Sequence, residues 1–112
     1  MRNREEAQLS AALLEYLESA KPSCVYCAIP NGGSMGLIEA TNLKRQGMIA
    51  GAADWVFTWH NDSGWIELKT KNGGTTDHQS AFRHRCSELQ VRYQIARSLD
   101  DCIRILKQWG VV

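Results

Sequence analysis

Two runs rich in aromatic and β-branched residues, 54–59 and 65–70, constrain the fold of this chain most strongly. Residues of these types favour β-strands. Between the runs, the segment Asn61–Gly64 has the small and polar composition that is typical of a turn. The pattern therefore predicts a β-hairpin in the middle of the chain.

The second run predicts two chemically different faces for this hairpin. Successive side chains of a strand point to opposite faces, so Ile66 and Leu68 share one face, while Glu67 and Lys69 share the other. We expect a sheet with one apolar face and one charged face.

The register of the hairpin decides which residues join Glu67 on the charged face. A four-residue loop that closes on the pair His60 and Trp65 places Thr58 opposite Glu67. Asp54 then lies on the same face as Glu67, whereas a slip of one residue would send Asp54 to the other side.

The rest of the chain predicts helices and strands around the hairpin. In chain order we expect a helix over about residues 5–19, a strand over 24–29, a long connection, the hairpin, a helix opened by Thr76, a strand over 92–97, and a helix capped by Ser98 and ended near Gly110. Gln79, Phe82, Cys86 and Leu89 form the inward face of the helix that Thr76 opens. This order predicts one α/β (α+β) domain over residues 1–112.

Global charge and hydropathy exclude several classes of protein. The formal net charge is +1, too small to indicate a nucleic-acid or membrane-surface protein by itself. No stretch approaches the roughly 18 apolar residues of a membrane span, and the N-terminus has no signal-peptide core. We expect no membrane partner and a cytoplasmic location.

The four cysteines predict thiols rather than a metal site. Only Cys24 and Cys27 have the spacing of zinc ligands, but residues three apart in a strand point to opposite faces. The sequence has no second CxxC or CxxH motif that could supply the other two zinc ligands. We expect buried free thiols and no structural zinc.

Five polar residues are predicted to converge on the charged face. Asp54, Glu67 and Lys69 lie on the hairpin, and Glu6 and Gln79 approach from two helices. Carboxylate oxygens suit Mg²⁺ or Mn²⁺, and a lysine beside them can assist a water molecule that attacks a phosphate. Simpler interpretations remain open: a surface ion pair for Glu67 and Lys69, a first-turn helix carboxylate for Glu6, and a capping role for Gln79.

Several motifs together resemble a standalone VRR-NUC domain, the virus-type replication and repair nuclease branch of the PD-(D/E)XK superfamily. They cover nearly the whole chain: Ile29–Gly33, Gly47–Trp55, Ile66–Thr70, Gln79-x-x-Phe82 and Ala96–Asp101. The resemblance implies a PD-(D/E)XK-like αβββαβ core with a mixed four-stranded sheet flanked by helices, followed here by an extra C-terminal helix.

The resemblance also implies roles for the convergent residues. Asp54 and Glu67 correspond to metal ligands, the backbone carbonyl of Leu68 completes their set, and Lys69 corresponds to the catalytic lysine. Gln79 matches the glutamine of the motif, near the metal or its water.

Two details of the resemblance bear on the preorganisation of the site. Glu6 matches the glutamate of the first helix, with an indirect role toward the metal, although its neighbour Glu5 offers an alternative register. Ala53 stands where the family usually has proline before Asp54. Alanine keeps the carboxylate in place but lacks the fixed φ of proline, so we expect weaker preorganisation.

A local excess of basic residues lies beside the predicted site. Residues 69–97 contain six Lys and Arg against two Asp and Glu. Phosphate contacts supply much of the sequence-independent affinity for DNA, so Lys71, Arg83, Arg85, Lys44 and Arg45 are candidate DNA contacts. An ordinary solvated helix face explains the same charges.

The sequence therefore supports two hypotheses about function. The first is a Mg²⁺- or Mn²⁺-dependent DNA endonuclease. For it, the resemblance implies a phage-derived homodimer acting on branched DNA such as four-way (Holliday) junctions during DNA repair, in a bacterial or phage-infected cell. The second is a nucleic-acid-binding or scaffolding module of the same fold without turnover. Intact Asp54, Glu67 and Lys69 favour the first.

Overall fold

The computed structural model describes residues 3–30 and 36–112. They form four helices and four strands: α1 (Arg4–Ala20), β1 (Val25–Ala28), α2 (Leu37–Arg45), β2 (Trp55–Trp59), β3 (Asp62–Leu68), α3 (Asp77–Glu88), β4 (Arg92–Ala96) and α4 (Leu99–Gln108). The part Asn31–Gly33 of the motif that begins at Ile29 lies outside the described residues.

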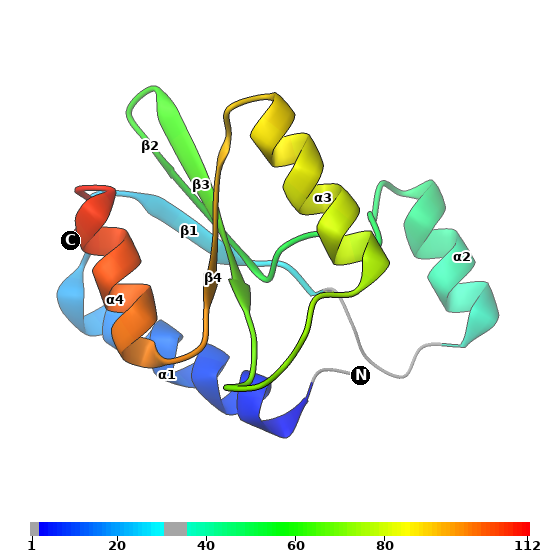
Figure 1. The fold of residues 1–112 in the computed structure, drawn as a ribbon, viewed down its shortest axis with the longest axis horizontal. Coiled ribbons are helices and arrows are strands. Elements are labelled where there is room, and N and C mark those ends of the chain that lie inside the picture. Colours follow the sequence, from blue (N-terminus) through cyan, green and yellow to red (C-terminus); the bar gives the residue numbers. More distant parts are fainter. Residues whose placement is uncertain (1–2, 31–35) are drawn as a thin grey trace.

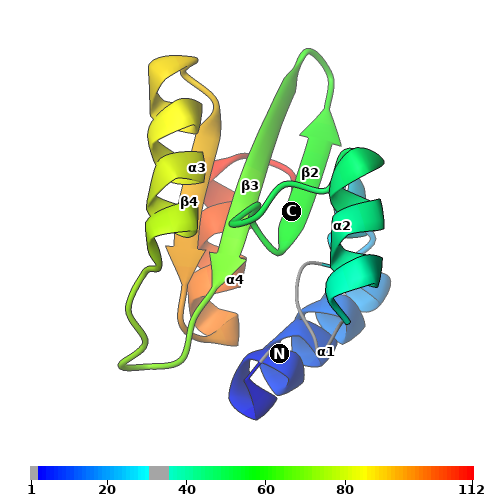
Figure 2. The ribbon, with the colours of Figure 1, turned by 90° about the vertical axis from the view of Figure 1, so that its right-hand side faces the viewer.

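The four strands form one mixed sheet in the order β1-β2-β3-β4 (Figure 1). Strands β1, β2 and β3 pair antiparallel, and β3 pairs parallel with β4 across the connection through α3. Helices α1 and α4 cover one face and α3 covers the other (Figures 1 and 2). The predicted fold class, with its αβββαβ core and additional C-terminal helix, is confirmed.

The β2–β3 hairpin confirms the predicted faces but not the predicted register. Only His60 and Asn61 form its turn, and Asn61 has a positive φ of 59°. Thr58 therefore pairs with Ser63, so its predicted position opposite Glu67 is wrong by four residues. Because a shift by an even number keeps each side chain on its face, the predicted faces survive this error.

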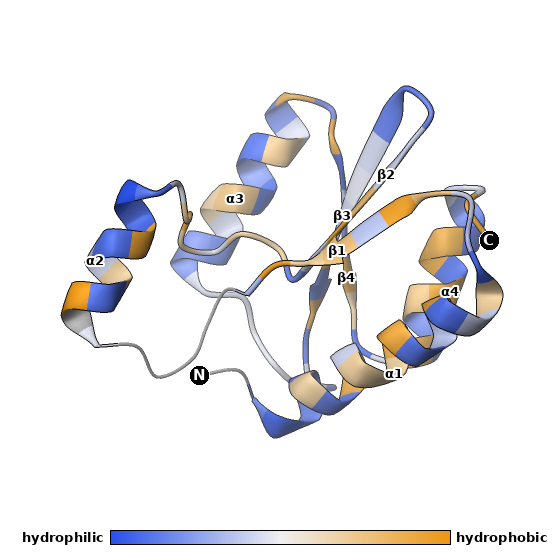
Figure 3. Ribbon diagram, turned by 180° about the vertical axis from the view of Figure 1, so that it is seen from behind, coloured by the Kyte–Doolittle hydropathy of each residue, from blue (hydrophilic) through white to orange (hydrophobic). Residues whose placement is uncertain are grey.

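The hydrophobic core lies between the sheet and the helices α1 and α4. It consists of fully or almost fully buried side chains from these elements and from the segment after α4: Leu13, Leu17, Trp55, Phe57, Ile66, Leu68, Ala96, Cys102, Ile105, Leu106 and Val111. The ribbon coloured by hydropathy shows apolar residues interspersed with polar ones along α1 and α4, as expected for helices with one buried side (Figure 3). We call the sheet face that contributes to this core the closed face.

The opposite sheet face is only partly covered, and we call it the open face. Helix α3 packs against β4 on this side, where Cys86 is buried and Phe82 is half-buried. Leu89 is 57% exposed, so its predicted place on the inward face of this helix is wrong. Toward β1 the open face carries Val25, which is 73% exposed, and the exposed Cys27.

Helix α2 interrupts the connection that the sequence predicts as irregular. Its N-cap is Gly36, which has no capping side chain, so the usual signal for a helix start is missing. The helix stands at one end of the molecule, beside the segment that leads into β2 (Figures 1 and 2). Lys44 and Arg45 lie exposed in its last turn.

The cysteines are free thiols in different environments. Cys86 and Cys102 are buried as predicted, Cys24 is half-buried, and Cys27 is exposed, which corrects the expectation of burial for that residue. Cys27 is exposed because β1 is an edge strand and α3 does not reach it. Among the described residues, no helix has both the length and the apolar character needed to cross a bilayer.

Candidate active site

Asp54 and Glu67 meet because β2 and β3 pair antiparallel. The ladder pairs Trp55 with Ile66, and its next step places Asp54 opposite Glu67 on the open face. The Leu68 backbone N–H donates a hydrogen bond of 2.7 Å to Asp54 Oδ2, which fixes this carboxylate against the edge of β3. The predicted juxtaposition of the two acids is present.

The buried charged side chains form a single group. In the described part of the chain, only Asp54, Glu67 and Lys69 are both charged and buried, with exposed fractions of 8%, 2% and 6%. Burial of a charge is costly unless partners compensate it. These three residues are not an ordinary surface ion pair, so that simpler interpretation of Glu67 and Lys69 does not apply.

The environment of Glu67 strongly disfavours its ionised form. Burial, repulsion from Asp54 and a side-chain hydrogen bond with Asp54 raise the pKa of Glu67 to about 8, against the opposing effect of Lys69. One carboxylate oxygen of Glu67, Oε1, is buried and receives no hydrogen bond from any donor in residues 3–30 and 36–112. Two adjacent acids with an unsatisfied oxygen form an electronegative site.

Gln79 links this site to the start of α3. Its side-chain Oε1 accepts hydrogen bonds from the Thr76 backbone N–H, at 3.0 Å, and from the Lys69 ammonium group. Its Nε2 donates to Glu67 Oε2 at 3.2 Å. Thr76 completes the predicted capping box by accepting from the Gln79 N–H. Gln79 therefore caps α3 and contacts Lys69 and Glu67 at the same time.

Lys69 lies directly beyond β3 but keeps the alignment of the strand. Its backbone N–H donates to the Ala96 carbonyl at 3.0 Å, which continues the parallel pairing with β4 by one residue. Its side chain therefore points to the same face as Glu67 and reaches Gln79. The ammonium group is held in place by a neutral acceptor.

Glu6 approaches the site from α1. It is half-buried, whereas Glu5 is exposed, and the charge of Glu6 contributes to the raised pKa of Glu67. This placement favours Glu6 over Glu5 as the inward glutamate. Within the described residues no group of three or more His, Cys, Asp or Glu side chains is arranged to hold a metal ion.

The glycine-rich segment before Asp54 packs against α3. Gly51 has a φ of +83°, and a Cβ at this position would lie 2.3 Å from the backbone carbon and oxygen of His78. The absence of a side chain at Gly51 therefore allows close approach to the helix that carries Gln79. Ala53, the residue directly before Asp54, is completely buried.

Tyr93 is a site neighbour that the sequence analysis did not single out. It lies on β4 opposite Trp65, and its buried hydroxyl has no hydrogen-bond partner among the described residues. Burial and the charges of Glu67 and Asp54 raise its pKa. Alternation shows only which residues of β4 share a face with Tyr93. Which face of the sheet that is depends on how β4 pairs with β3, so the local sequence does not place Tyr93 beside the acids.

The candidate DNA contacts are exposed but distributed over several elements. Lys71 lies in the loop after Lys69; Arg83 lies over the Tyr93 ring at 5.9 Å, and Arg85 is 3.6 Å from Glu88. Lys44 and Arg45 are in the last turn of α2.

Arg97 orders the loop that carries Lys71. Its guanidinium donates hydrogen bonds of 2.8 Å to the carbonyl oxygens of Thr70 and Gly73. No local sequence pattern predicts this contact, because it joins residues more than twenty positions apart.

Comparison with known proteins bears on the fold of this chain. No protein-family model matches the sequence, and no curated protein matches it either. A solved structure described as a VRR_NUC domain protein is similar to this chain, with a TM-score of 0.73 and 17% sequence identity over 97% of this chain and 90% of the other. The chain therefore has the fold of a VRR_NUC domain, as its motifs predicted.

Proposed function

We propose that this protein is a metal-dependent DNA endonuclease whose active site contains Asp54, Glu67, Lys69 and Gln79. The observation that carries the proposal is the buried pair of acids, one with an unsatisfied oxygen, beside an ordered lysine. The likeness to a VRR_NUC domain protein adds support, because that name describes a nuclease domain.

The donor set fits a hard divalent cation. Asp54 and Glu67 supply carboxylate oxygens, and Mg²⁺ and Mn²⁺ prefer oxygen ligands while retaining several waters. A cation would also satisfy Glu67 Oε1 and favour the ionised form of Glu67, which its surroundings otherwise oppose. The Leu68 carbonyl is the third proposed ligand, and Glu6 acts indirectly.

A divalent cation bound there would supply a more acidic water and neutralise charge on the scissile phosphate. Lys69 would orient the attacking water and offset negative charge that develops on the phosphate. Gln79 holds the Lys69 ammonium in place, so no rearrangement of this side chain precedes the reaction. Thr76 in turn fixes Gln79 through the capping box.

The family resemblance and the size of the chain support a substrate class. Standalone VRR-NUC domains suggest branched DNA, such as four-way junctions, cut by a homodimer. A protomer of 112 residues has a small footprint, and two copies related by a twofold axis would present two sites to symmetrically related strands. Lys71, Arg83 and Arg85 are the proposed phosphate contacts nearest the acids.

The experiment is a cleavage assay on plasmid, linear duplex and junction DNA with Mg²⁺, Mn²⁺ or EDTA. We expect cleavage with either cation and none in EDTA. Asp54→Asn and Lys69→Met should each lower the rate by roughly 10²–10⁴-fold, because each keeps the size of the side chain but removes its charge.

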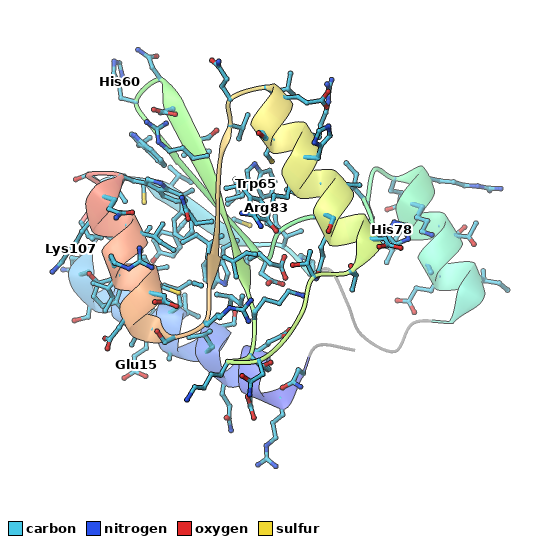
Figure 4. All side chains as sticks on the ribbon, viewed as in Figure 1. Glu15, His60, Trp65, His78, Arg83 and Lys107 are labelled. Carbon is cyan, nitrogen blue, oxygen red and sulfur yellow. The ribbon has the colours of Figure 1, made fainter. Side chains whose placement is uncertain are left out.

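Matched controls change the same chemistry away from the site. Asp100→Asn and Lys107→Met alter exposed residues of α4, and Lys107 lies on the far side of the sheet from α3 (Figure 4). Both should cleave at the parental rate. If the parent binds DNA but cleaves none with either cation, the non-catalytic binding module replaces this proposal.

A further inference from the structure

A separate cavity of about 400 Å³ lies on the open face beside the candidate active site. It is bounded by α3, by β3, by the residue that precedes β4 and by the segment that precedes β2. Its walls include Ile49, Trp65, His78, Phe82, Arg85 and Leu89. None of the proposed metal ligands lines it, so it is not the metal site itself.

The walls of the cavity are apolar and aromatic. Trp65 and Phe82 meet edge to face, with ring centroids 5.1 Å apart. At the mouth, Ile49 and Leu89 are 60% and 57% exposed. Large apolar side chains left this open beside a cavity indicate a binding surface rather than a core.

The cavity lies next to the candidate active site along β3 and α3. Trp65 precedes Glu67 by two residues on β3, so both side chains lie on the open face about 7 Å apart along the strand. His78 precedes Gln79 directly on α3. In Figure 4, Trp65 lies between the strands and α3, whereas His78 lies at the end of α3 nearer α2.

Charge around the cavity favours a polyanion over a second copy of this chain. Arg85 lines the cavity, with its guanidinium 3.6 Å from the exposed Glu88 carboxylate, and Arg83 is exposed on the same helix without an acidic partner among the ion pairs of the described residues. A twofold axis through this surface would bring the same basic residues of two protomers together, which is unfavourable. A DNA strand instead brings phosphates to the arginines and an aromatic base to the apolar walls.

We propose that this cavity receives one unpaired nucleobase of the DNA strand that is bound at the candidate active site. The inference rests on the proposed function, because it uses the acids to place the strand. Two steps along β3 span about 7 Å, roughly the axial rise of two base steps, so the base belongs within two nucleotides of the scissile phosphate. The cavity selects DNA with a base that is free to leave the helix, as at a junction, bulge or end.

The volume fits this occupant. Pockets that bury most of a small organic molecule have volumes of roughly 300–1,000 Å³. The cavity lies at the small end of that range, which admits a single planar base but not a base pair held in a duplex. Stacking against Trp65 and Phe82 is insensitive to base identity, so we expect selectivity for an unpaired base rather than for a sequence.

The test compares two duplexes that differ only in a one-nucleotide bulge, which carries either a base or an abasic site. Binding is measured by fluorescence anisotropy in EDTA, so the result does not depend on cleavage. The parent should bind the base-containing bulge about tenfold more tightly, the loss expected when one stacked base is removed. Ala81→Trp fills the cavity from an exposed position of α3 and should reduce this preference to about twofold or less.

Controls separate filling of the cavity from a general effect on the helix. Ser87→Trp adds the same ring at an exposed position of α3 outside the cavity and should keep the parental preference. Leu89→Glu, at the exposed mouth, should also abolish the preference, whereas its exposed neighbour Gln90→Glu should not. Circular dichroism confirms that each variant is folded.

Two results would overturn the inference. The first is equal binding of the two bulges by the parent. The second is sedimentation showing that Ala81→Trp converts a dimer into a monomer while the base preference is unchanged, which would identify the cavity as a protein interface. Absence of cleavage together with a tenfold base preference would instead reject the nuclease proposal and leave the base site in place.

Discussion

The two faces of the sheet bury chemically different side chains. On the closed face, α1 and α4 bury a continuous set of apolar side chains that includes Phe57, Ile66 and Leu68. On the open face, the buried side chains include two acids, Glu67 on β3 and Asp54 directly before β2. Burial of apolar area stabilises a fold, whereas burial of like charges opposes it.

This comparison shows how a small domain can hold an unfavourable polar cluster. Because side chains alternate along β3, the consecutive residues Ile66 and Glu67 lie on opposite faces of the sheet without any change in backbone conformation. The closed face stabilises the backbone, and the backbone then holds the acids at a spacing that they would not adopt freely. If this is correct, substitutions on the two faces should have opposite effects on stability.

The strongest test removes an aromatic side chain from the closed face. Phe57→Ala deletes a completely buried ring that packs against Trp55 and Trp109, and should lower the free energy of unfolding by about 3–5 kcal/mol. Urea denaturation measures this change. Thr58→Ala, the adjacent exposed residue on the open face, should change stability by about 0.5 kcal/mol or less. Equal losses would refute the division of the faces.

A smaller effect is expected when the closed face is overfilled. Gly64 lies in β3, and a Cβ there would come within 2.6 Å of the Trp109 ring. Gly64→Ala should therefore destabilise the protein by about 1–3 kcal/mol, because the ring and its neighbours must shift. Thermal unfolding tests this, with Ser63→Ala as the neighbour on the open face. A neutral Gly64→Ala would mean that the contact with Trp109 is loose.

Local patterns predicted the features that depend on near neighbours in the chain. Thr76 and Gln79 are three residues apart, so the start of α3 could be located from the capping box alone. Alternation placed Asp54 and Glu67 on one face, and this result was insensitive to a register error of four residues. The pair of acids and the lysine were therefore predictable.

Features that depend on distant parts of the chain were not predictable in this way. The hairpin has a two-residue turn in which Asn61 adopts a positive φ. The polar segment around Asn61 is longer than this turn, so its composition does not show which two residues form the turn. Tyr93 reaches the site only through the parallel pairing of β4, and Arg97 reaches the 70–73 loop only through the fold. Helix α2 lacked a capping side chain, and Cys27 is exposed because β1 is an edge strand.

On the open face, a substitution of Glu67 should raise the free energy of unfolding rather than lower it. The folded state raises the pKa of Glu67 from 4.5 to about 8, so between these values the folded protein holds a proton that the unfolded chain releases. The free energy of unfolding of the metal-free protein should therefore fall as the pH rises from 4.5 to about 8. Glu67→Gln should remove this loss, so the metal-free variant should be more stable than the metal-free parent at pH 8.

The same variant tests the cation. Thermal unfolding in EDTA should show Glu67→Gln more stable than the parent at pH 8 and similar to it near pH 4. Mg²⁺ should raise the stability of the parent, because a ligand that binds only the folded state stabilises it, and should leave the variant almost unchanged. Glu15→Gln, on an exposed position of α1 labelled in Figure 4, controls for removal of a carboxylate. A less stable Glu67→Gln at pH 8 would show that the acid stabilises the apo fold.

The smallest effect is expected for an exposed charged side chain at the edge of the open face. Lys71 is exposed in a loop that Arg97 orders, so Lys71→Ala should leave stability unchanged and weaken DNA binding by roughly threefold, equally for all sequences. The slope of log affinity against log salt concentration should become shallower by about 1, because one phosphate contact and its released counterion are lost. Lys107→Ala, on α4 behind the closed face, should change neither affinity nor slope, because this face holds the fold together and does not meet DNA. An equal change in slope for both lysines would mean that DNA senses only the overall charge of the protein, and that the open face has no privileged role in binding.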